Sequence, residues 1–424
     1  MLSIFKNKAH LIWVCTALFY MYQFILRVSP SVMIDELMSS FHITASLVGT
    51  LSSLAMYSYS LLQIPAGLMA DNYGVRKTVL GSLLLCILGT LIFVLTPNIT
   101  VASLGRLLMG AGSASAFLCV SKVSTQWFPS SKRSTLLGIT MAMGTLGALN
   151  GGTPLSILVG TVGWKFSLVV VTFIGFFIFI LAAALLPSYE TDIKELESHP
   201  VKIGSLVKDF VEVVRSKTCW IYAFTALGIY LSISVVGDLW GVSFLIRAYG
   251  LEKESAVKIT SSIYIGLCFG SISLTALSDR LKCTKSLIHT SILGIFICVF
   301  LMIYFASNPF FSLEILSGLF FLTGFFCGSE MLCFSNALGH APERLSGTVT
   351  GFVNCIVMLG GALIQQLVGF LLDIFWLGIK DSNGVRLYSK FEYQTAFSLV
   401  LAVILISAIT SLYLPRSIRQ TQIE

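Results

Sequence analysis

The chain has 424 residues, of which 56% are hydrophobic and 11% charged, and its mean hydropathy is +0.89. Such a composition leaves too little polar surface to cover a soluble globule of this size, so it excludes a soluble protein and predicts a polytopic membrane protein. The formal net charge of +7 does not indicate nucleic acid as a partner, because the Lys and Arg residues stand in short segments between apolar runs.

Apolar segments long enough to span a membrane recur along the whole chain and predict about twelve helices, six in each half. They are residues 10–34, 45–69, 77–96, 100–126, 135–159 and 164–186, followed by 219–246, 256–278, 286–306, 311–337, 346–372 and 393–414. The fold class predicted is therefore an all-α polytopic membrane protein.

One long charged, Pro-broken stretch separates the two sets of helices. It predicts three parts: an N-terminal six-helix bundle at 1–186, a cytoplasmic linker with a short surface helix at 187–217, and a C-terminal six-helix bundle at 218–424.

The segment Gln63–Leu80 predicts a tight cytoplasmic hairpin between the second and third helices. Asp71 can bind exposed backbone N–H groups, Gly74 permits a turn with positive φ, and Arg76 with Lys77 holds the turn on the positive side of the membrane. The same pattern returns 208 residues later, where Asp279 stands in the place of Asp71. A loop repeated at half the chain length predicts a duplicated bundle.

The distribution of basic residues predicts the orientation. With the N-terminus inside, 17 Lys and Arg residues fall on the inner side and 7 on the outer side. This asymmetry predicts that both termini are cytoplasmic, and we expect a bacterial inner membrane.

The ten cysteines lie mostly inside apolar segments, without paired spacing or neighbouring His clusters. We therefore expect neither a disulfide framework nor a metal site. No GxxxxGK[ST] run is present, which excludes an ATP-driven pump built on that loop, and no cofactor is expected.

The sequence GLMADNYGVRK between the second and third helices resembles the signature of the major facilitator superfamily, and twelve helices in two repeats extend the resemblance over essentially the whole chain. The match to GxLxDxxGxRK falls on Gly67, Leu68, Asp71, Gly74, Arg76 and Lys77. A second family element, RxxxGxG on the fourth helix, is matched by Arg106, Gly110 and Gly112.

The resemblance implies two six-helix bundles that rock around a central cavity lined by helices 1, 4, 7 and 10. It implies that Asp71 and Arg76 are gate residues at the cytoplasmic side, with Gly67, Gly74, Lys77 and the repeated Asp279 in the same motif. The stretches TQWFPSSKRSTLLG and ERLSGTVTGFVN are also similar to bacterial permeases grouped with sugar-phosphate carriers and with lysosomal dipeptide-type carriers.

Charged side chains inside spanning helices are costly unless they face a cavity or a partner, so each is a functional candidate. Tyr20, Gln23 and Arg27 recur at i, i+3 and i+7 and give the first helix a polar stripe. A guanidinium suits a carboxylate or phosphate on a substrate, and the alternative is that Arg27 snorkels to the outer surface.

Asp238 on the seventh helix has Tyr230 and Ser234 on its face. Since helices 1 and 7 face each other in the implied fold, we expect Asp238 to pair with Arg27, with an interfacial Asp in contact with water as the alternative.

Glu330 on the tenth helix is the best candidate for a proton site, because a lipid-buried carboxyl group takes up a proton more readily than one in water; a structural, hydrogen-bonded Glu is the alternative. The resemblance gives Arg106 a role in coupling. Lys122 is either a cation for an anionic substrate or a snorkelling helix end. Intramembrane amides such as Gln365 and Gln366 more often join helices than bind solute.

The sequence thus predicts a secondary transporter and not an enzyme. It is expected to move a small polar, anionic or zwitterionic solute of the organic acid, amino acid, dipeptide or sugar-acid class by alternating access, coupled to protons. The alternatives are a proton-driven exporter of a drug or siderophore-like compound and a non-transporting sensor. The expected partners are a small-molecule substrate, H⁺ and the lipid bilayer, with no nucleic acid, and the chain is expected to be a monomer.

Overall fold

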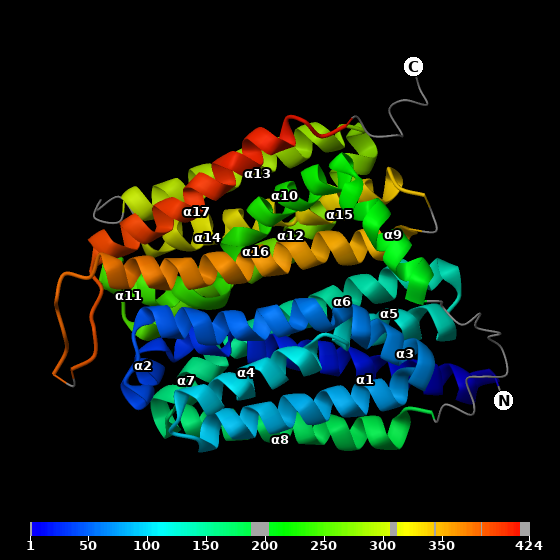
Figure 1. Ribbon diagram of the computed structural model, residues 1–424, viewed down its shortest axis with the longest axis horizontal. Helices are drawn as coiled ribbons and strands as arrows, with labels where there is room; N and C mark the ends of the chain where they lie inside the picture. The colour runs from blue at the N-terminus through cyan, green and yellow to red at the C-terminus, as the bar shows by residue number, and fades with distance from the viewer. Residues whose placement is uncertain (1, 188–202, 306–311, 343–344, 383, 416–424) are drawn as a thin grey trace. The chain divides into compact units, whose positions relative to one another are not determined.

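The computed structural model describes residues 2–187, 203–305, 312–342, 345–382 and 384–415 and is helical nearly throughout them (Figure 1). Within these ranges the β pairing is a single bridge between Lys380 and Arg386. Ten helical stretches of the described chain are long and apolar enough to cross a membrane. The chain is therefore an integral multi-pass membrane protein, as its composition predicts.

The first half of the chain forms α1 (Leu2–Val28), η1 (Ser29–Val32), α2 (Ile34–Phe41), α3 (Ala45–Leu95), α4 (Ile99–Ser113), α5 (Ala116–Trp127), α6 (Ser130–Gly151), α7 (Thr153–Val162) and α8 (Trp164–Leu185). The second half forms α9 (Ile203–Arg215), α10 (Lys217–Leu231), η3 (Ser232–Trp240), α11 (Gly241–Tyr249), α12 (Lys253–Leu281), α13 (Thr284–Tyr304), α14 (Leu313–Cys327), α15 (Glu330–Gly339), α16 (Ser346–Ile374) and α17 (Lys390–Ser411).

Within the described residues, all twelve predicted spans fall mainly on helical residues, but several are broken. The span predicted at 100–126 consists of α4 and α5, and the one predicted at 311–337 consists of α14 and α15. The two predicted spans outside the ten apolar stretches, 45–69 and 135–159, fall on the first part of α3 and on α6 with α7.

The chain divides into two compact units. The N-terminal unit comprises Met1–Glu36 and Leu51–His199, and the C-terminal unit comprises Leu37–Thr50 and Pro200–Glu424. One boundary between the units thus falls inside α3. The sequence did not indicate that residues 37–50 group with the C-terminal unit. The boundaries predicted at 186 and 218 stay a prediction.

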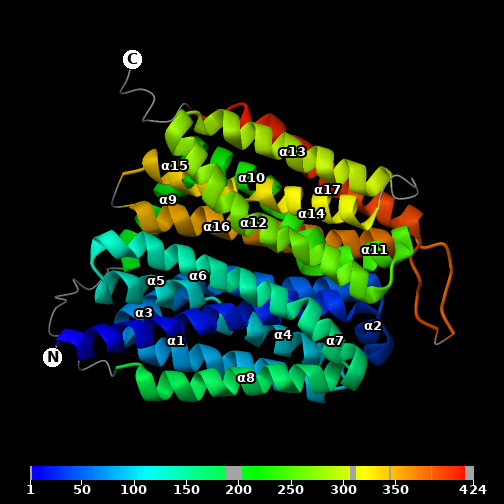
Figure 2. The same ribbon diagram turned by 180° about the vertical axis from the view of Figure 1, so that it is seen from behind.

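A central helix organises the packing within each unit. In the N-terminal unit α1 contacts α4, α5, α6 and α8. The approach of α6 is close because glycines face α1: a Cβ on Gly147 would lie 2.2 Å from the Met21 carbonyl oxygen. In the C-terminal unit α10 contacts α13, α14, α15, α16 and α17, while α12, α13 and α14 lie side by side (Figure 2).

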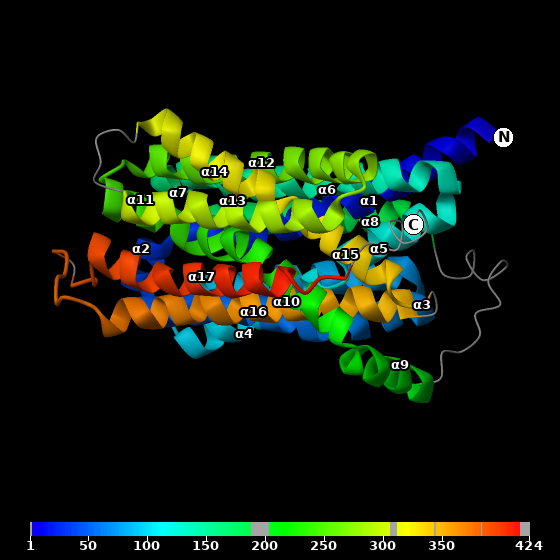
Figure 3. The same cartoon turned by 90° about the horizontal axis from the view of Figure 1, so that it is seen from above.

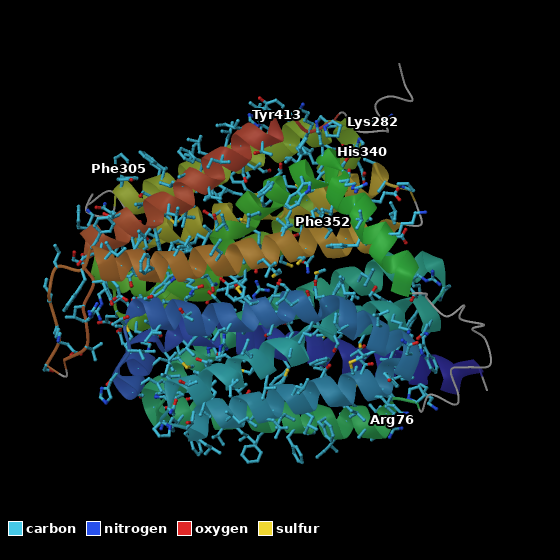
Figure 4. All side chains as sticks on the ribbon, in the orientation of Figure 1. Arg76, Lys282, Phe305, His340, Phe352 and Tyr413 are labelled. Carbon is cyan, nitrogen blue, oxygen red and sulfur yellow. The ribbon has the colours of Figure 1, made fainter. Side chains whose placement is uncertain are left out.

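The short surface helix predicted inside the linker is confirmed as α9. It lies at one end of the C-terminal unit (Figure 3), where the Trp220 indole N–H donates to the Val214 carbonyl over 2.7 Å. The ring of Phe352 on α16 (Figure 4) packs edge-on against Trp220 at 4.9 Å between centroids and also contacts Phe210 of α9. Three aromatic side chains therefore fix this amphipathic helix to the bundle.

The turn predicted at Gly74 is confirmed. Although α3 runs from Ala45 to Leu95, Gly74 has φ 79° and ψ 164°, so the element is two helices joined at this residue. Only glycine occupies this region of backbone conformation readily, because a Cβ would clash with the neighbouring peptide.

Replacing Gly74 by alanine should destabilise the protein by about 1–3 kcal/mol, because the backbone at that position becomes strained. Gly81→Ala on the same element is the matched control: nothing lies within 4 Å of the position its Cβ would occupy. Thermal midpoints in detergent should fall for Gly74→Ala and stay at or above wild type for Gly81→Ala. Equal midpoints for the two variants would contradict the strain argument.

Candidate functional site

Arg106 of α4 ties three elements of the N-terminal unit together. It is 3% exposed, its Nε donates to the Leu51 carbonyl of α3 over 3.1 Å, and its Nη1 donates to the Leu26 carbonyl of α1 over 3.3 Å. A guanidinium can bond two separate carbonyls because its donors form a rigid fork. The structure therefore places Arg106 where α1, α3 and α4 meet.

The Leu26 carbonyl is available because of Pro30. Residue 30 would normally donate its N–H to this carbonyl in a continuing α-helix, but proline has no N–H. Here α1 ends at Val28 and continues as the 3-10 turn η1, while the Ser29 hydroxyl donates to the Leu26 carbonyl over 2.9 Å. Arg106 and Ser29 together satisfy the acceptor that the proline leaves open.

The polar stripe predicted on α1 lies in the interior of the unit. Tyr20 is 6% and Gln23 3% exposed, and the Tyr20 ring packs edge-on against Phe24. The guanidinium of Arg27, which is half-buried, lies 5.6 Å from the centroid of the Phe24 ring. This cation–π contact holds the charge beside the aromatic part of the stripe.

Lys122 of α5 donates from Nζ to the Ala70 carbonyl over 2.7 Å. Ala70 lies in the last turn before the break at Gly74, where carbonyls lack helical partners and attract a cation. This contact is a helix-capping one, and the substrate-binding role predicted for Lys122 stays a prediction.

The residues of the predicted gate surround the same break. Arg76 donates to the Leu186 and Ala183 carbonyls over 3.0 and 2.8 Å, at the C-terminal end of α8 (Figure 4). Lys77 is exposed, and Gly67 lies inside α3, where its Cβ position is 3.9 Å from Leu118. Asp71 lies in the helix just before Gly74, and its side chain is outside the part of the structure that is described.

In the C-terminal unit, Asp279 is exposed near the end of α12. Arg76 thus contacts the end of α8. The gate role of the residues in this motif stays a prediction.

The segment after α10 is a π-helix, η3, and it carries Asp238. π-helical turns are rare, and they are frequent at functional sites. Asp238 is 2% exposed and accepts a hydrogen bond of 2.7 Å from the Tyr264 hydroxyl of α12. Tyr230 lies in the last turn of α10, two residues before η3 begins, and is also buried.

Gln365 of α16 holds both ends of η3. The Trp240 indole N–H donates to the Gln365 carbonyl over 3.0 Å, and the Gln365 amide donates to the Ser234 carbonyl. Gly361, one turn earlier, allows the approach, since its Cβ would lie 2.8 Å from the Ser234 hydroxyl oxygen. The amide joins two helices, as expected for a polar residue in a membrane helix.

Glu330 is the first residue of α15, directly after the break at Gly328 and Ser329. Its side chain is 8% exposed, and two buried thiols, Cys327 and Cys333, lie close enough to interact with it electrostatically. A buried carboxyl group at a helix break inside a membrane span is a candidate functional group. The role in proton coupling predicted for Glu330 stays a prediction.

Two GxxxG pairs pack against each other beside that break. Gly266 and Gly270 of α12 face Gly324 and Gly328 at the end of α14: a Cβ on Gly270 would lie 1.9 Å from the Phe325 carbonyl oxygen, and one on Gly324 would lie 1.8 Å from that of Ile263. Small residues at this spacing allow helix backbones to touch.

No group of three or more His, Cys, Asp or Glu side chains that could hold a metal ion occurs in the described ranges. Each unit therefore has its own candidate positions, which are polar side chains at helix breaks. They lie at η1 and Gly74 in the N-terminal unit, and at η3 and the α14–α15 junction in the C-terminal unit.

Apolar spanning helices with buried charges placed at their breaks define a multi-pass membrane protein, and such charges are typical of solute pathways. The chain belongs to the major facilitator superfamily, whose family model, Major Facilitator Superfamily, matches residues 12–365. This confirms the resemblance and the predicted fold class.

Curated relatives are similar at low identity. The chain is 22% identical to a probable sulfoacetate transporter of Cupriavidus necator over 64% of this chain and 65% of the relative. It is 23% identical to the gentisate transporter of Corynebacterium glutamicum over 80% of this chain and 76% of the relative. It is also 23% identical to the hexuronate transporter of Bacillus subtilis over 78% and 80%.

The match to the sulfoacetate relative thus spans less than two thirds of that protein's length, and a 25% match to the uncharacterized transporter YybO of Bacillus subtilis spans 55% of this chain and 57% of that protein. Among solved structures, a bacterial homologue of the human lysosomal transporter Spinster superposes with a TM-score of 0.76 at 14% identity, over 96% of this chain and 97% of that one. At this identity the likeness shows the fold alone.

Sequence reasoning missed η3 and the role of residues at the end of α16. A π-helix has no composition of its own, and the segment SISVVGDLW reads as ordinary apolar helix. Asp373 is not among the predicted site residues, but it accepts hydrogen bonds from three different residues. The only sequence signal for it is an acidic residue at the end of an apolar span.

Proposed function

We propose that the protein is a secondary transporter that moves a small organic acid or zwitterion across a membrane by alternating access. Arg27 is the observation that carries this proposal. It is a permanent positive charge on the central helix of the N-terminal unit, beside an aromatic ring and within a stripe of buried polar side chains. Arginine binds carboxylates, sulfonates and phosphates through paired donors.

The relatives support the same chemistry. Sulfoacetate, gentisate and hexuronates, the substrates in the relatives' names, are all small acids. The spanning helices of the N-terminal unit carry Arg27, Arg106 and Lys122. In the described part of the chain the buried acids, Asp238, Glu330 and Glu392, lie in the C-terminal unit. We infer that the substrate's acidic group is bound by the N-terminal unit.

The experiment is uptake by proteoliposomes that contain the purified protein. Labelled galacturonate, gentisate and sulfoacetate should be tested with and without an imposed proton gradient, and ethidium should be included to test the exporter alternative. At least one acid should accumulate, Arg27→Gln should abolish its uptake, and Arg27→Lys should retain part of it because the charge remains. Transport of ethidium and of none of the acids would refute the acid-substrate proposal.

Proton coupling is the second part of the proposal. Glu330 and Asp238 carry the proton, and Arg106 couples the positions of the helices it contacts to the protonation of these acids. Glu330→Gln should transport in exchange mode but lose the response to the proton gradient, because the amide cannot release a proton. Full gradient dependence in this variant would refute the role of Glu330. We also propose that both termini are cytoplasmic, that the protein lies in a bacterial inner membrane and that it is a monomer.

Tyr264→Phe tests Asp238 without removing the carboxyl group. The variant loses the 2.7 Å hydrogen bond to Asp238 and little volume. The hydrogen bond holds the Asp238 carboxyl group in position, so its loss should weaken the response of uptake to the proton gradient more than it changes the rate of exchange. Tyr249→Phe is the control, because that hydroxyl donates to the Met302 carbonyl and touches no acid in the contacts described. An unchanged response to the proton gradient in Tyr264→Phe would remove Asp238 from the coupling scheme.

A further inference from the structure

The turn between α12 and α13 holds a lysine in a backbone conformation that side chains rarely adopt. Lys282 has φ 53° and ψ 28°, in the left-handed region. The turn is fixed on both sides of this residue: the Lys282 N–H donates to the Ser278 carbonyl over 2.9 Å, and the Ser278 and Thr284 hydroxyls lie 2.7 Å apart. Glycine adopts this conformation without strain, whereas a Cβ makes it costly. The strained lysine is therefore a candidate for a role that its side chain performs.

The corresponding turn in the first half of the chain lacks this lysine. The two loops align at an offset of 208 residues, so Lys282 stands where the first copy has Gly74, and Arg280 stands where it has Asn72. Gly74 also has a positive φ, of 79°. The second copy thus carries two positive charges that the first copy does not have, and one of them occupies the position where glycine fits best.

Three apolar stretches end or begin at this turn. They are Lys253–Leu281, Thr284–Tyr304 and Lys390–Ser411, each long and apolar enough to cross a membrane. The Lys285 ammonium group donates to the Leu412 carbonyl over 2.7 Å and so joins the start of α13 to the end of α17. The turn therefore lies at the edge of the apolar layer, where lipid headgroups are found.

The surface around the turn is both basic and apolar. Arg280 and Lys282 are exposed, and Leu281 between them is 59% exposed. Tyr413, which follows the carbonyl that Lys285 binds, is 71% exposed and lies at the same end of the C-terminal unit as Lys282 (Figure 4). Asp279 is exposed as well, so the group of Asp279, Arg280 and Lys282 carries a net positive charge.

We propose that the surface formed by Arg280, Leu281, Lys282 and Tyr413 binds an anionic phospholipid. The lipid phosphate accepts hydrogen bonds from the guanidinium and the ammonium group, which are charge-assisted donors. The glycerol and the first acyl carbons lie against Leu281 and the Tyr413 ring, since tyrosine suits the boundary between headgroups and hydrocarbon. Free phosphate would satisfy the two cations but leave this apolar surface uncovered, so a lipid complements the surface better. The site lies within the C-terminal unit and does not depend on which solute is transported.

Native mass spectrometry of the purified full chain in a neutral detergent tests the site. Phosphatidylglycerol and phosphatidylcholine with the same acyl chains are titrated separately, and the wild type should bind phosphatidylglycerol more tightly. Lys282→Gln should weaken phosphatidylglycerol binding by about fivefold, as expected for one basic group near a membrane surface, and leave phosphatidylcholine binding unchanged. Lys258→Gln is the matched control, because this exposed lysine of α12 lies near its other end, paired with Glu254.

Two further variants separate binding from folding. Lys282→Gly removes the charge and the backbone strain together, so it should lose the same affinity for phosphatidylglycerol while its thermal midpoint in detergent stays at or above that of the wild type. Tyr413→Ala should weaken the binding of both lipids alike, because its contact is with the part that the two lipids share.

Three results would overturn the proposal. The first is equal affinity for phosphatidylglycerol in Lys282→Gln and Lys258→Gln. The second is displacement of bound phosphatidylglycerol by an excess of inorganic phosphate, which would make the site one for a soluble anion. The third is a thermal midpoint of Lys282→Gly below that of the wild type, since the lysine would then stabilise the turn and its strain would not single out its side chain.

Discussion

Arg106→Leu is expected to abolish transport while the protein stays folded. The arginine is buried, and its removal takes away hydrogen bonds to the Leu26 and Leu51 carbonyls. Neither acceptor is then left empty, because Ser29 still donates to the Leu26 carbonyl and Leu51 lies inside α3, where its carbonyl accepts a helical bond. Removing a costly buried charge offsets much of the loss, so we expect a stability change within about 1 kcal/mol.

Transport should fall by roughly a hundredfold, since Arg106 joins α4 to the break at the end of α1 and to α3. Arg106→Lys should recover little activity, because a single ammonium group cannot span two carbonyls on different helices. The measurements are uptake by proteoliposomes and the thermal midpoint in detergent.

The matched control for Arg106 is Arg133→Leu. Arg133 also donates to two carbonyls, those of Phe128 and Thr125, but at the end of α5 and the start of α6, where the surroundings are partly exposed. Its loss should change neither uptake nor stability by much. If Arg106→Leu kept uptake within twofold of this control, Arg106 would be a packing residue and not part of coupling.

The sequence predicted those features that depend on local chemistry. The positive φ at Gly74 follows from a glycine in a charged turn, and α9 follows from an amphipathic segment in a polar stretch. The family could be predicted because its motif consists of closely spaced residues between two apolar segments. Such a motif can be seen in a single sequence.

Features that depend on the meeting of distant segments were not predictable in the same way. Asp373 and Ser46 are 327 residues apart, and nothing in either stretch indicates the other. The two hydrogen bonds between η3 and Gln365 likewise join segments that are far apart in the sequence. Lys122 illustrates the same limit: its charge was visible, but its acceptor, the Ala70 carbonyl, is a backbone atom that no sequence pattern marks.

The glycines between α12 and α14 form a contact that neither segment indicates by itself. GLCFG at 266–270 and GFFCG at 324–328 are ordinary small-residue pairs in sequence, and the structure places them against each other. This contact lies at the end of α14, directly before the break after which Glu330 begins α15. Four residues without polar side chains thus pack next to the proposed proton site.

Gly270→Val should have the largest effect on stability of any substitution considered. Its Cβ would lie 1.9 Å from the Phe325 carbonyl oxygen and 2.7 Å from the Phe325 Cα, which are backbone atoms that no rotamer change can move. The two helices must separate, and the loss should be about 3 kcal/mol or more, seen as a much lower thermal midpoint or as failure to purify as a monodisperse protein.

Gly318→Ala is the matched control for Gly270→Val, because it lies on α14 and nothing is within 4 Å of its Cβ position. The variant with the smaller side chain, Gly270→Ala, connects the contact between α12 and α14 to function. Where this variant folds, α14 should be displaced and Glu330 with it. The response of uptake to the proton gradient should then weaken more than the rate of exchange. A thermal midpoint of Gly270→Val equal to that of Gly318→Ala would show that α12 and α14 do not touch through their backbones, and the position inferred for Glu330 would lose its support.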